Sequence, residues 1–438
     1  MKPIGQAIDI AEDIPLGVSR DGMRAAVISA CYKAFTAMSF TNGLVLVYLS
    51  AMKLDGTTVL NLLSVVNVLM AISLIPCAHL ADCYGKRRVT FVGIFLCGLG
   101  FALLPMIGFF PDIMVTGVVA LGIGLFGIGH GAQMAAWFAI LHPLVPSHYR
   151  GRFFGILRVA WQLCVVVSGL LIAFVLPRET SLPLLKMIMV LTGLTVIPWA
   201  WYSYKIPEVE REQCDIRELA GPLKIIARAP GYLPFCAYVF IINLFVGGCP
   251  AIFGLIEKRI LALPDGTVIF LANMTLLGGV LGFYVGGKVV DRIGAKLLFL
   301  FCHFGYGIIL TLFVVRDLLP IPLFPLLIVI HFLFGVLTAC SSISYSTEMM
   351  ALIPPIRKSI TTSFCSTMIH GGSALSGLLS ASAISMGLLA ASWPLCGVSR
   401  SAYDAVLVFC AALIVLMSVT LGLIPSVVGQ PKSESSPL

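Results

Sequence analysis

Apolar residues fill most of the chain in continuous stretches, which short segments carrying most of the charge separate. A helix of about 20 apolar residues is long enough to cross the hydrocarbon core of a bilayer. The stretches are continuous rather than alternating, which excludes a transmembrane β-barrel. The pattern predicts twelve transmembrane helices, over residues 25–50, 57–80, 89–109, 113–141, 153–176, 183–204, 233–256, 266–287, 297–315, 321–346, 360–386 and 403–425.

The composition indicates a multi-pass membrane protein embedded in a lipid bilayer. Of the 438 residues, 59% are hydrophobic and 11% are charged, whereas a soluble domain carries roughly 25% charged residues. The 13 cysteines form no paired C-x-x-C motif, so we expect no metal site and no cofactor. The net charge of +8 is explained by basic loops, and it calls for no nucleic-acid partner.

The distribution of Lys and Arg predicts the orientation. Of the 28 basic residues, nineteen fall on one side of the predicted helices and seven on the other. Basic residues concentrate on the cytoplasmic side of membrane proteins. We therefore expect both termini in the cytoplasm and the helices in the plasma (inner) membrane.

A polar stretch between the sixth and seventh predicted helices divides the chain into two sets of six. The predicted organisation is a cytoplasmic N-terminal segment (1–24), a first six-helix bundle (25–204), a cytoplasmic central loop (205–232), a second six-helix bundle (233–426) and a disordered cytoplasmic tail (427–438).

Two short patterns recur half a chain apart. Segments 78–88 and 287–296 each hold a small residue, an Asp four positions later, a Gly three positions after that, and then basic residues. The tetrapeptide Ser-Gly-Leu-Leu also occurs twice, at 168–171 and 376–379, with nearly the same offset. Matches in a common register indicate a duplicated membrane fold.

Twelve helices in two sixes, a polar central segment and the repeated G-x-x-x-D-x-x-G pattern resemble the major facilitator superfamily. The resemblance covers about residues 24–426, with Ala78 where the family usually has Gly. It implies an all-α fold of two pseudo-symmetric six-helix bundles that transports solutes by alternating access. The Arg of the fourth helix that the family ties to proton coupling has no counterpart, since His130 lies roughly there. The Gly-Pro motif of drug–proton antiporters is also absent.

The resemblance and the repeat together predict a conformational latch. By pseudo-symmetry, each motif Asp approaches a basic helix start in the other half, and this contact closes the inner side. The alternative is a plain surface turn with basic residues that follow the orientation rule. The predicted latch residues are Asp82, Gly85, Arg87, Asp291, Arg292, Gly294, Arg150, Arg152, Arg357 and Lys358.

Polar residues inside predicted helices are candidates for a solute site, because they are costly in lipid. Lys33 and Arg158 are the ionisable candidates, with snorkelling to the headgroups as the alternative. For the others the alternative is a set of separate hydrogen bonds between helices. The predicted substrate-binding residues are Lys33, Asn42, His130, Gln133, Arg158, Trp161, Gln162, Asn243 and His370.

Acidic residues are missing from the centres of the predicted helices, and Glu257 falls near the outer end of the seventh. This argues against a carboxylate proton relay in the middle of the membrane. His130 or His370 would titrate instead. The basic or neutral centre favours a neutral or anionic solute.

The sequence therefore predicts a secondary active or facilitative transporter of a small organic solute. A drug or metabolite exporter and a transporter-like sensor without flux are the alternatives. We find no phosphate loop, nucleophile elbow or H-E-x-x-H motif, so we expect no enzyme. The expected partners are a small-molecule substrate and a coupling ion such as H+, and the expected state is a monomer.

Overall fold

The computed structural model describes residues 16–40, 43–145, 150–177, 180–209, 226, 229–352 and 358–423. Within them the chain is almost wholly helical. The elements are α1 (Leu16–Met38), α2 (Leu44–Ala51), α3 (Gly56–Tyr84), α4 (Lys86–Leu103), η2 (Pro105–Phe109), α5 (Asp112–Leu144), α6 (Arg150–Val175), α7 (Leu182–Leu194), α8 (Val196–Tyr204), α10 (Tyr232–Val246), α11 (Cys249–Leu255), η4 (Ile256–Ile260), α12 (Asp265–Val314), α13 (Leu323–Leu352), α14 (Lys358–Ser385), β1 (Ser392–Leu395), β2 (Val398–Ser401) and α15 (Ala402–Leu423).

Each of the twelve predicted helices coincides with one helix, part of one, or a run of adjacent helices in the described residues. By length and composition, eight described helices qualify as membrane spans, and Ala402–Met417 is a shorter apolar helix. The surface is apolar as well, with Ile113 91% and Phe174 76% exposed. Large exposed hydrophobic side chains are expected where a surface faces lipid.

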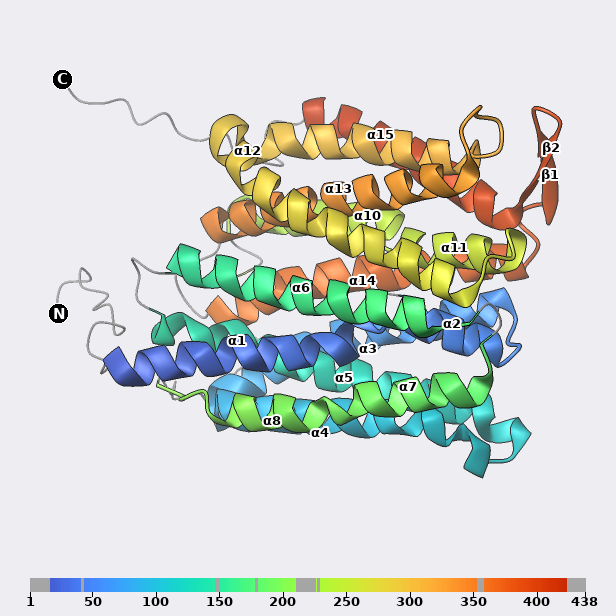
Figure 1. Ribbon diagram of the computed structural model, residues 1–438. Helices are drawn as coiled ribbons and strands as arrows, with labels where there is room; N and C mark the ends of the chain where they lie inside the picture. Colours follow the sequence, from blue (N-terminus) through green and yellow to red (C-terminus); the bar gives the residue numbers. More distant parts are fainter. Residues whose placement is uncertain are drawn as a thin grey trace, which may run out of the picture.

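The helices lie side by side in two groups (Figure 1). Helices α1 to α8 form the first half, and α10 to α15 form the second. Two pairs of helices make the main contacts between the halves: α3 packs against α14, and α6 packs against α12. The predicted fold of two six-helix bundles is confirmed.

The two ends of the bundle differ. One end carries the antiparallel hairpin β1–β2 (Figure 1), and we call it the hairpin end. The opposite end, where α1 and α4 begin, holds Lys86 and Arg87, and we call it the basic end.

The two repeated motifs are tighter than predicted. Gly85 alone separates α3 from α4, with φ 107° and ψ 131°. Gly294 kinks α12 with φ 79° and ψ 161°, and the helix continues on both sides. Glycine adopts a positive φ without the steric penalty of other residues. The expected loops of several residues are therefore wrong, because a single glycine makes each turn.

Two pseudo-symmetric helices are broken at corresponding positions. The chain leaves α1 after Met38 and resumes as α2 at Leu44, and α10 gives way to α11 at Gly247 and Gly248. These breaks lie about 208 residues apart, which is the offset of the sequence repeat. In transporters, interrupted helices often frame the solute site.

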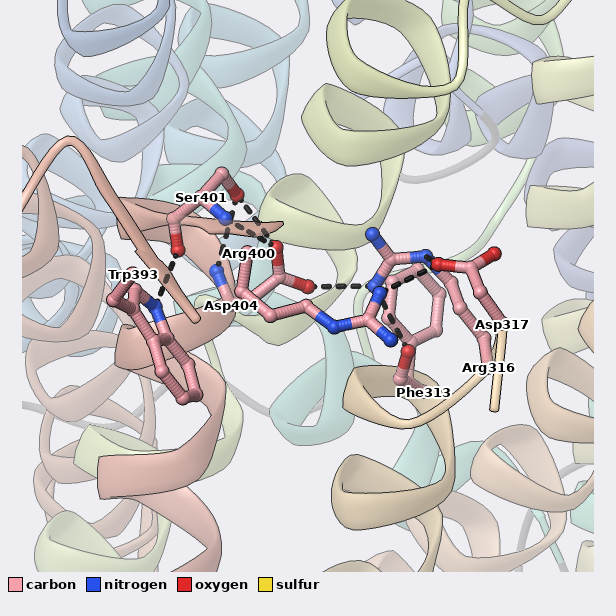
Figure 2. A network of polar contacts seen from close by, with 7 residues as sticks. All are labelled: Phe313, Arg316, Asp317, Trp393, Arg400, Ser401 and Asp404. Atoms are coloured by element: carbon pink, nitrogen blue, oxygen red, sulfur yellow. Dashed lines mark hydrogen bonds and ion pairs between the residues drawn. The ribbon is translucent and has the colours of Figure 1, made fainter. Parts of the chain in front are cut away.

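A polar network joins the hairpin to the ends of α12 and α15 (Figure 2). Arg316 donates to Asp404 at 2.6 Å, and Arg400 donates to Asp317 at 2.5 Å. Asp404 also accepts from the backbone N–H of Ser401 at 2.9 Å and from its hydroxyl at 2.7 Å. Ser401 and Asp404 form the capping box of α15. The network fixes the hairpin against the second half.

Helices α12 and α13 approach each other at two glycines. A methyl group on Gly278 would collide with the carbonyl of Phe332, and one on Gly335 with the carbonyl of Thr275. Small residues permit such close packing of helices in membranes. The approach brings the side chains of α12 and α13 within hydrogen-bonding distance.

Replacing Gly335 by Ala is expected to destabilise the protein by about 1–3 kcal/mol, because the two backbones must separate. Gly287→Ala is the control, since a methyl group there meets nothing within 4 Å. An alanine in a helix stabilises it by up to about 1 kcal/mol relative to glycine. Thermal unfolding of both purified variants measures the difference. Equal melting temperatures would contradict the close approach.

Candidate functional site

A cavity of about 520 Å³ lies between the two halves of the bundle. Its walls come from α1, α3, α5 and α6 on one side, and from the α10–α11 break, η4, α12, α13 and α14 on the other. Both broken helices contribute, through Phe40 and Gly43 in the first half and Gly247 and Gly248 in the second. The cavity is therefore built by residues of both halves.

Lys33 of α1 lines the cavity, and its ammonium donates to Oε1 of Gln133 on α5 at 2.5 Å. This position does not fit the snorkelling alternative, since the ammonium points to a buried amide. No carboxylate among the described residues forms an ion pair with Lys33. Its positive charge therefore faces the cavity without an ion-pair partner from the part of the chain that the structure covers.

Arg158 of α6 brings a second positive charge to the same cavity. Its guanidinium carbon lies 4.8 Å from the centre of the Phe283 ring on α12, a cation–π contact that crosses between the halves. Trp161, one turn further along α6, also lines the cavity. No described carboxylate forms an ion pair with Arg158 either.

Two histidines complete the polar lining that was predicted. The His130 ring stacks against Phe126, with centroids 5.7 Å apart, and its Nδ1 is buried without a hydrogen-bond partner among the described residues. His370 of α14 hydrogen-bonds through Nδ1 to Oδ1 of Asn67 on α3 at 3.1 Å. This bond links the halves at the cavity wall.

Three predicted residues lie outside the cavity lining, and one lies outside the described residues. Gln133 is fully buried behind Lys33. Gln162 donates to the carbonyl of Leu276 on α12 at 2.8 Å, and Asn243 donates within α10 to Val239 at 2.8 Å. For Gln162 the alternative of a hydrogen bond between helices fits the geometry better, whereas the bond of Asn243 stays within its own helix. Asn42 is not among the described residues.

The structure also places a carboxylate in the cavity wall, although the sequence predicts no acidic residue in the middle of the membrane. Glu257 and His331 both line it, and Oε1 of Glu257 lies 2.6 Å from Nε2 of His331. Glu257 belongs to the π-helical turn η4, where the N–H of Leu261 bonds to the carbonyl of Ile256 at 2.9 Å. Such a turn shifts helical register by one residue, so hydropathy alone cannot predict which way Glu257 faces.

Of the predicted latch residues, Asp82, Gly85 and Arg87 lie at the basic end, where α3 gives way to α4. Asp82 is buried, and Arg292 is exposed. Arg87 donates to the carbonyl of Tyr204 at 2.6 Å and lies 3.9 Å over its ring, so it holds α8 within its own half. The latch across the halves stays a prediction. The side chains of Asp291, Arg150, Arg152, Arg357 and Lys358 are outside the described part of the structure.

Comparison with known proteins agrees with this architecture. The sequence profile of the Major Facilitator Superfamily matches residues 28–377. The chain belongs to this superfamily. Its members are transporters, so this protein is a transporter-family membrane protein and not an enzyme.

One curated relative is a probable 4-methylmuconolactone transporter of Cupriavidus pinatubonensis. It is 25% identical over 225 residues, which are 50% of this chain and 50% of that protein. The chain thus spans about half the length of this relative in the match.

Solved structures of superfamily transporters show the same fold. A POT family transporter in complex with 5-aminolevulinic acid has a TM-score of 0.72 at 12% identity, covering 92% of this chain and 95% of that one. The nucleoside transporter NupG gives 0.66 at 11% identity, covering 93% and 99%. The xylose transporter XylE from E. coli gives 0.64 at 12% identity, covering 92% and 98%. At these identities the likeness concerns the fold alone.

Proposed function

We propose that this superfamily member carries a small organic anion across the membrane by alternating access. The observation that carries this proposal is the pair of cavity-lining cations, Lys33 and Arg158, which have no ion-pair partner among the described residues. A charge held inside a membrane protein without a counter-charge is costly. A carboxylate entering the cavity supplies that counter-charge, and a guanidinium can bind it through two parallel hydrogen bonds.

The size and lining of the cavity support a compact solute. Small-molecule sites have volumes of about 300–1,000 Å³, and this cavity measures about 520 Å³. Trp161, Phe126 and Phe283 add aromatic surface, which favours a solute with a flat or cyclic part. The curated relative is named for a small lactone, which supports a small organic solute here.

The two halves would rock about the cavity, sliding along the α3–α14 and α6–α12 contacts. Both termini would lie in the cytoplasm, with the basic end facing inward in the plasma (inner) membrane. The bias of Lys and Arg supports this orientation. The repeated Asp motifs would close the inner side during the cycle.

The proposal is tested by flux through purified protein in liposomes. Mandelate and lactate are compared with mandelamide and lactamide, which match them in shape but carry no charge. Uptake of at least one carboxylate should be saturable and about tenfold or more faster than uptake of its amide, because the amide lacks the charge-assisted bonds. Protein-free liposomes measure passive permeation of the uncharged acid.

Equal transport of an acid and its amide would contradict an anion site. Binding without flux would favour the sensor, and it is detected as a ligand-induced rise in melting temperature. Loading the solute inside or outside distinguishes an exporter from an importer.

A further inference from the structure

We propose that Glu257, His331 and Thr275 form the site at which a proton is bound and carried together with the anion, an inference that rests on the proposed function. The three residues come from η4, α13 and α12 of the second half. Nε2 of His331 lies 2.6 Å from Oε1 of Glu257, and Nδ1 of His331 lies 2.9 Å from the hydroxyl of Thr275. All three line the cavity that holds Lys33 and Arg158.

The cluster is buried but has unused hydrogen-bonding capacity. The side chains of Glu257 and His331 are 1% and 4% exposed. Oε2 of Glu257 is buried and has no hydrogen-bond partner among the described residues. An unsatisfied carboxylate oxygen in such a place is unfavourable. A proton arriving from the cavity removes the net negative charge of the buried Glu257–His331 pair and so lowers that cost.

His331 is the charge partner of Glu257 within the described part of the chain. The neighbouring cations of the same π-turn are engaged elsewhere, since Lys258 pairs with Asp265 and Arg259 donates to the carbonyl of Leu54. The other titratable or charged groups that line the cavity are Lys33, His130, Arg158 and His370. The protonation state of the Glu257–His331 pair therefore sets the charge of the second-half wall.

The hydrogen bonds of the cluster persist in both protonation states. A neutral His331 donates from Nε2 to Glu257 and accepts at Nδ1 from the Thr275 hydroxyl. A protonated His331 donates from both nitrogens, and the Thr275 oxygen accepts, because a hydroxyl both donates and accepts. One proton is added or lost, and the Thr275 hydroxyl turns from donor to acceptor while its contact with His331 is kept. The cluster can thus take up and release a proton with only a rotation of that hydroxyl.

The surroundings restrict the route of that proton. The Phe253 ring packs against His331, with centroids 5.4 Å apart, and it stacks on Phe313 at 4.3 Å. Phe334 covers Phe253 from α13, with centroids 5.3 Å apart. These rings are buried and exclude water on their side. The cluster exchanges protons through the cavity, and so only with the side to which the cavity is open.

The anion and the proton then favour each other. An anion bound in the cavity is repelled by the unprotonated Glu257 carboxylate, which lines the same space. Protonation of the Glu257–His331 pair weakens this repulsion, so binding of one promotes binding of the other by linkage. The carrier closes most readily when the anion and the proton are both bound. It therefore carries one proton with each monovalent anion.

The experiment uses the full-length protein in liposomes, with mandelate or the best carboxylate of the panel above as the probe. Two rates are measured: exchange of labelled for unlabelled anion at equal pH, and uptake driven by a gradient of one pH unit. The wild type should accumulate the anion about tenfold, since one unit is a tenfold proton gradient. Glu257→Gln should retain exchange within about threefold and lose the gradient-driven accumulation.

Glu208→Gln is the matched control. Glu208 accepts from the backbone N–H of Lys86 at 2.7 Å at the basic end, and an amide oxygen can replace that acceptor. This variant should accumulate like the wild type. His331→Gln is a second test of the pair, with the same expected loss of accumulation.

Several outcomes would overturn the proton site. The first is that Glu257→Gln accumulates the anion as strongly as the wild type does. The second is that anion uptake by the wild type does not depend on the pH gradient, a result that does not require any variant to fold. Loss of exchange together with accumulation in folded Glu257→Gln would make Glu257 a solute-binding residue instead. Absence of anion exchange in the wild type would instead reject the proposed function itself.

Discussion

Lys33→Met is expected to lower anion uptake at subsaturating concentration by about 10- to 100-fold. The ammonium is a charge-assisted donor in the cavity wall, and a hydrogen bond to a charged group contributes about 1.5–3 kcal/mol. Methionine keeps much of the length of the side chain and removes only the charge and the donor. Initial rates of labelled mandelate uptake in liposomes, taken over a range of concentrations, measure the effect.

The control is Lys53→Met, which removes one positive charge from an exposed turn between α2 and α3. Its uptake should match the wild type. If both variants slow uptake equally, the effect is one of overall charge and Lys33 does not bind the anion.

Lys33→Met also leaves Oε1 of Gln133 without its donor, so the variant is at risk of misfolding. The double variant Lys33→Met/Gln133→Leu removes both partners and avoids the unsatisfied amide oxygen. It should fold like the wild type and still fail to bind the anion. Normal uptake by the folded double variant would reject the cation site.

The helices were predictable because hydropathy acts over long stretches and depends little on neighbours. The repeat at 78–88 and 287–296 gave the duplicated architecture for a similar reason, since it is written in the local sequence. Hydropathy also placed the helix ends too far from Gly85 and Gly294, so the predicted turns were longer than the observed ones. A glycine with positive φ reverses a helix within one residue, and its spacing in the sequence does not reveal this.

The cavity was only partly predictable. Lys33, His130, Arg158, Trp161 and His370 were expected and line it. Depth in a helix identifies such residues, but it does not say which face of the helix they occupy. Gln162 and Asn243 have suitable depth, yet their amides satisfy backbone carbonyls.

Glu257 was missed for a different reason. Its position near a helix end suggested an interfacial acid, but the broken seventh helix and its π-turn carry it into the cavity wall. The Gly247-Gly-Cys-Pro250 sequence was a visible signal of that break. His331 lay in the tenth predicted helix, and its partner could not be found without the three-dimensional arrangement.

Part of the polar network at the hairpin end can be predicted from the sequence, because Ser401 and Asp404 have the spacing of a capping box. What the spacing does not show is that Arg316, 2% exposed, depends on Asp404, which is fully buried. Breaking a buried ion pair by removing one partner costs about 3–5 kcal/mol, since the other charge is left uncompensated.

Asp404→Asn is therefore expected to lower the free energy of unfolding by about 3–5 kcal/mol. Asparagine keeps an acceptor for the capping box and removes only the charge, so the loss reports the ion pair. Denaturant titration in mixed micelles measures it. Asp21→Asn is the control, because Asp21 is exposed near the start of α1 and a charge at the surface contributes within about 1 kcal/mol.

The double variant Arg316→Met/Asp404→Asn separates charge from packing. Methionine fills part of the volume of Arg316 without requiring a counter-charge, and replacing both partners of a buried pair is often nearly neutral. The double variant should thus recover most of the stability that Asp404→Asn loses. If it is as unstable as the single variant, the capping box and the shape of the site stabilise the hairpin end, and the ion pair adds little to them.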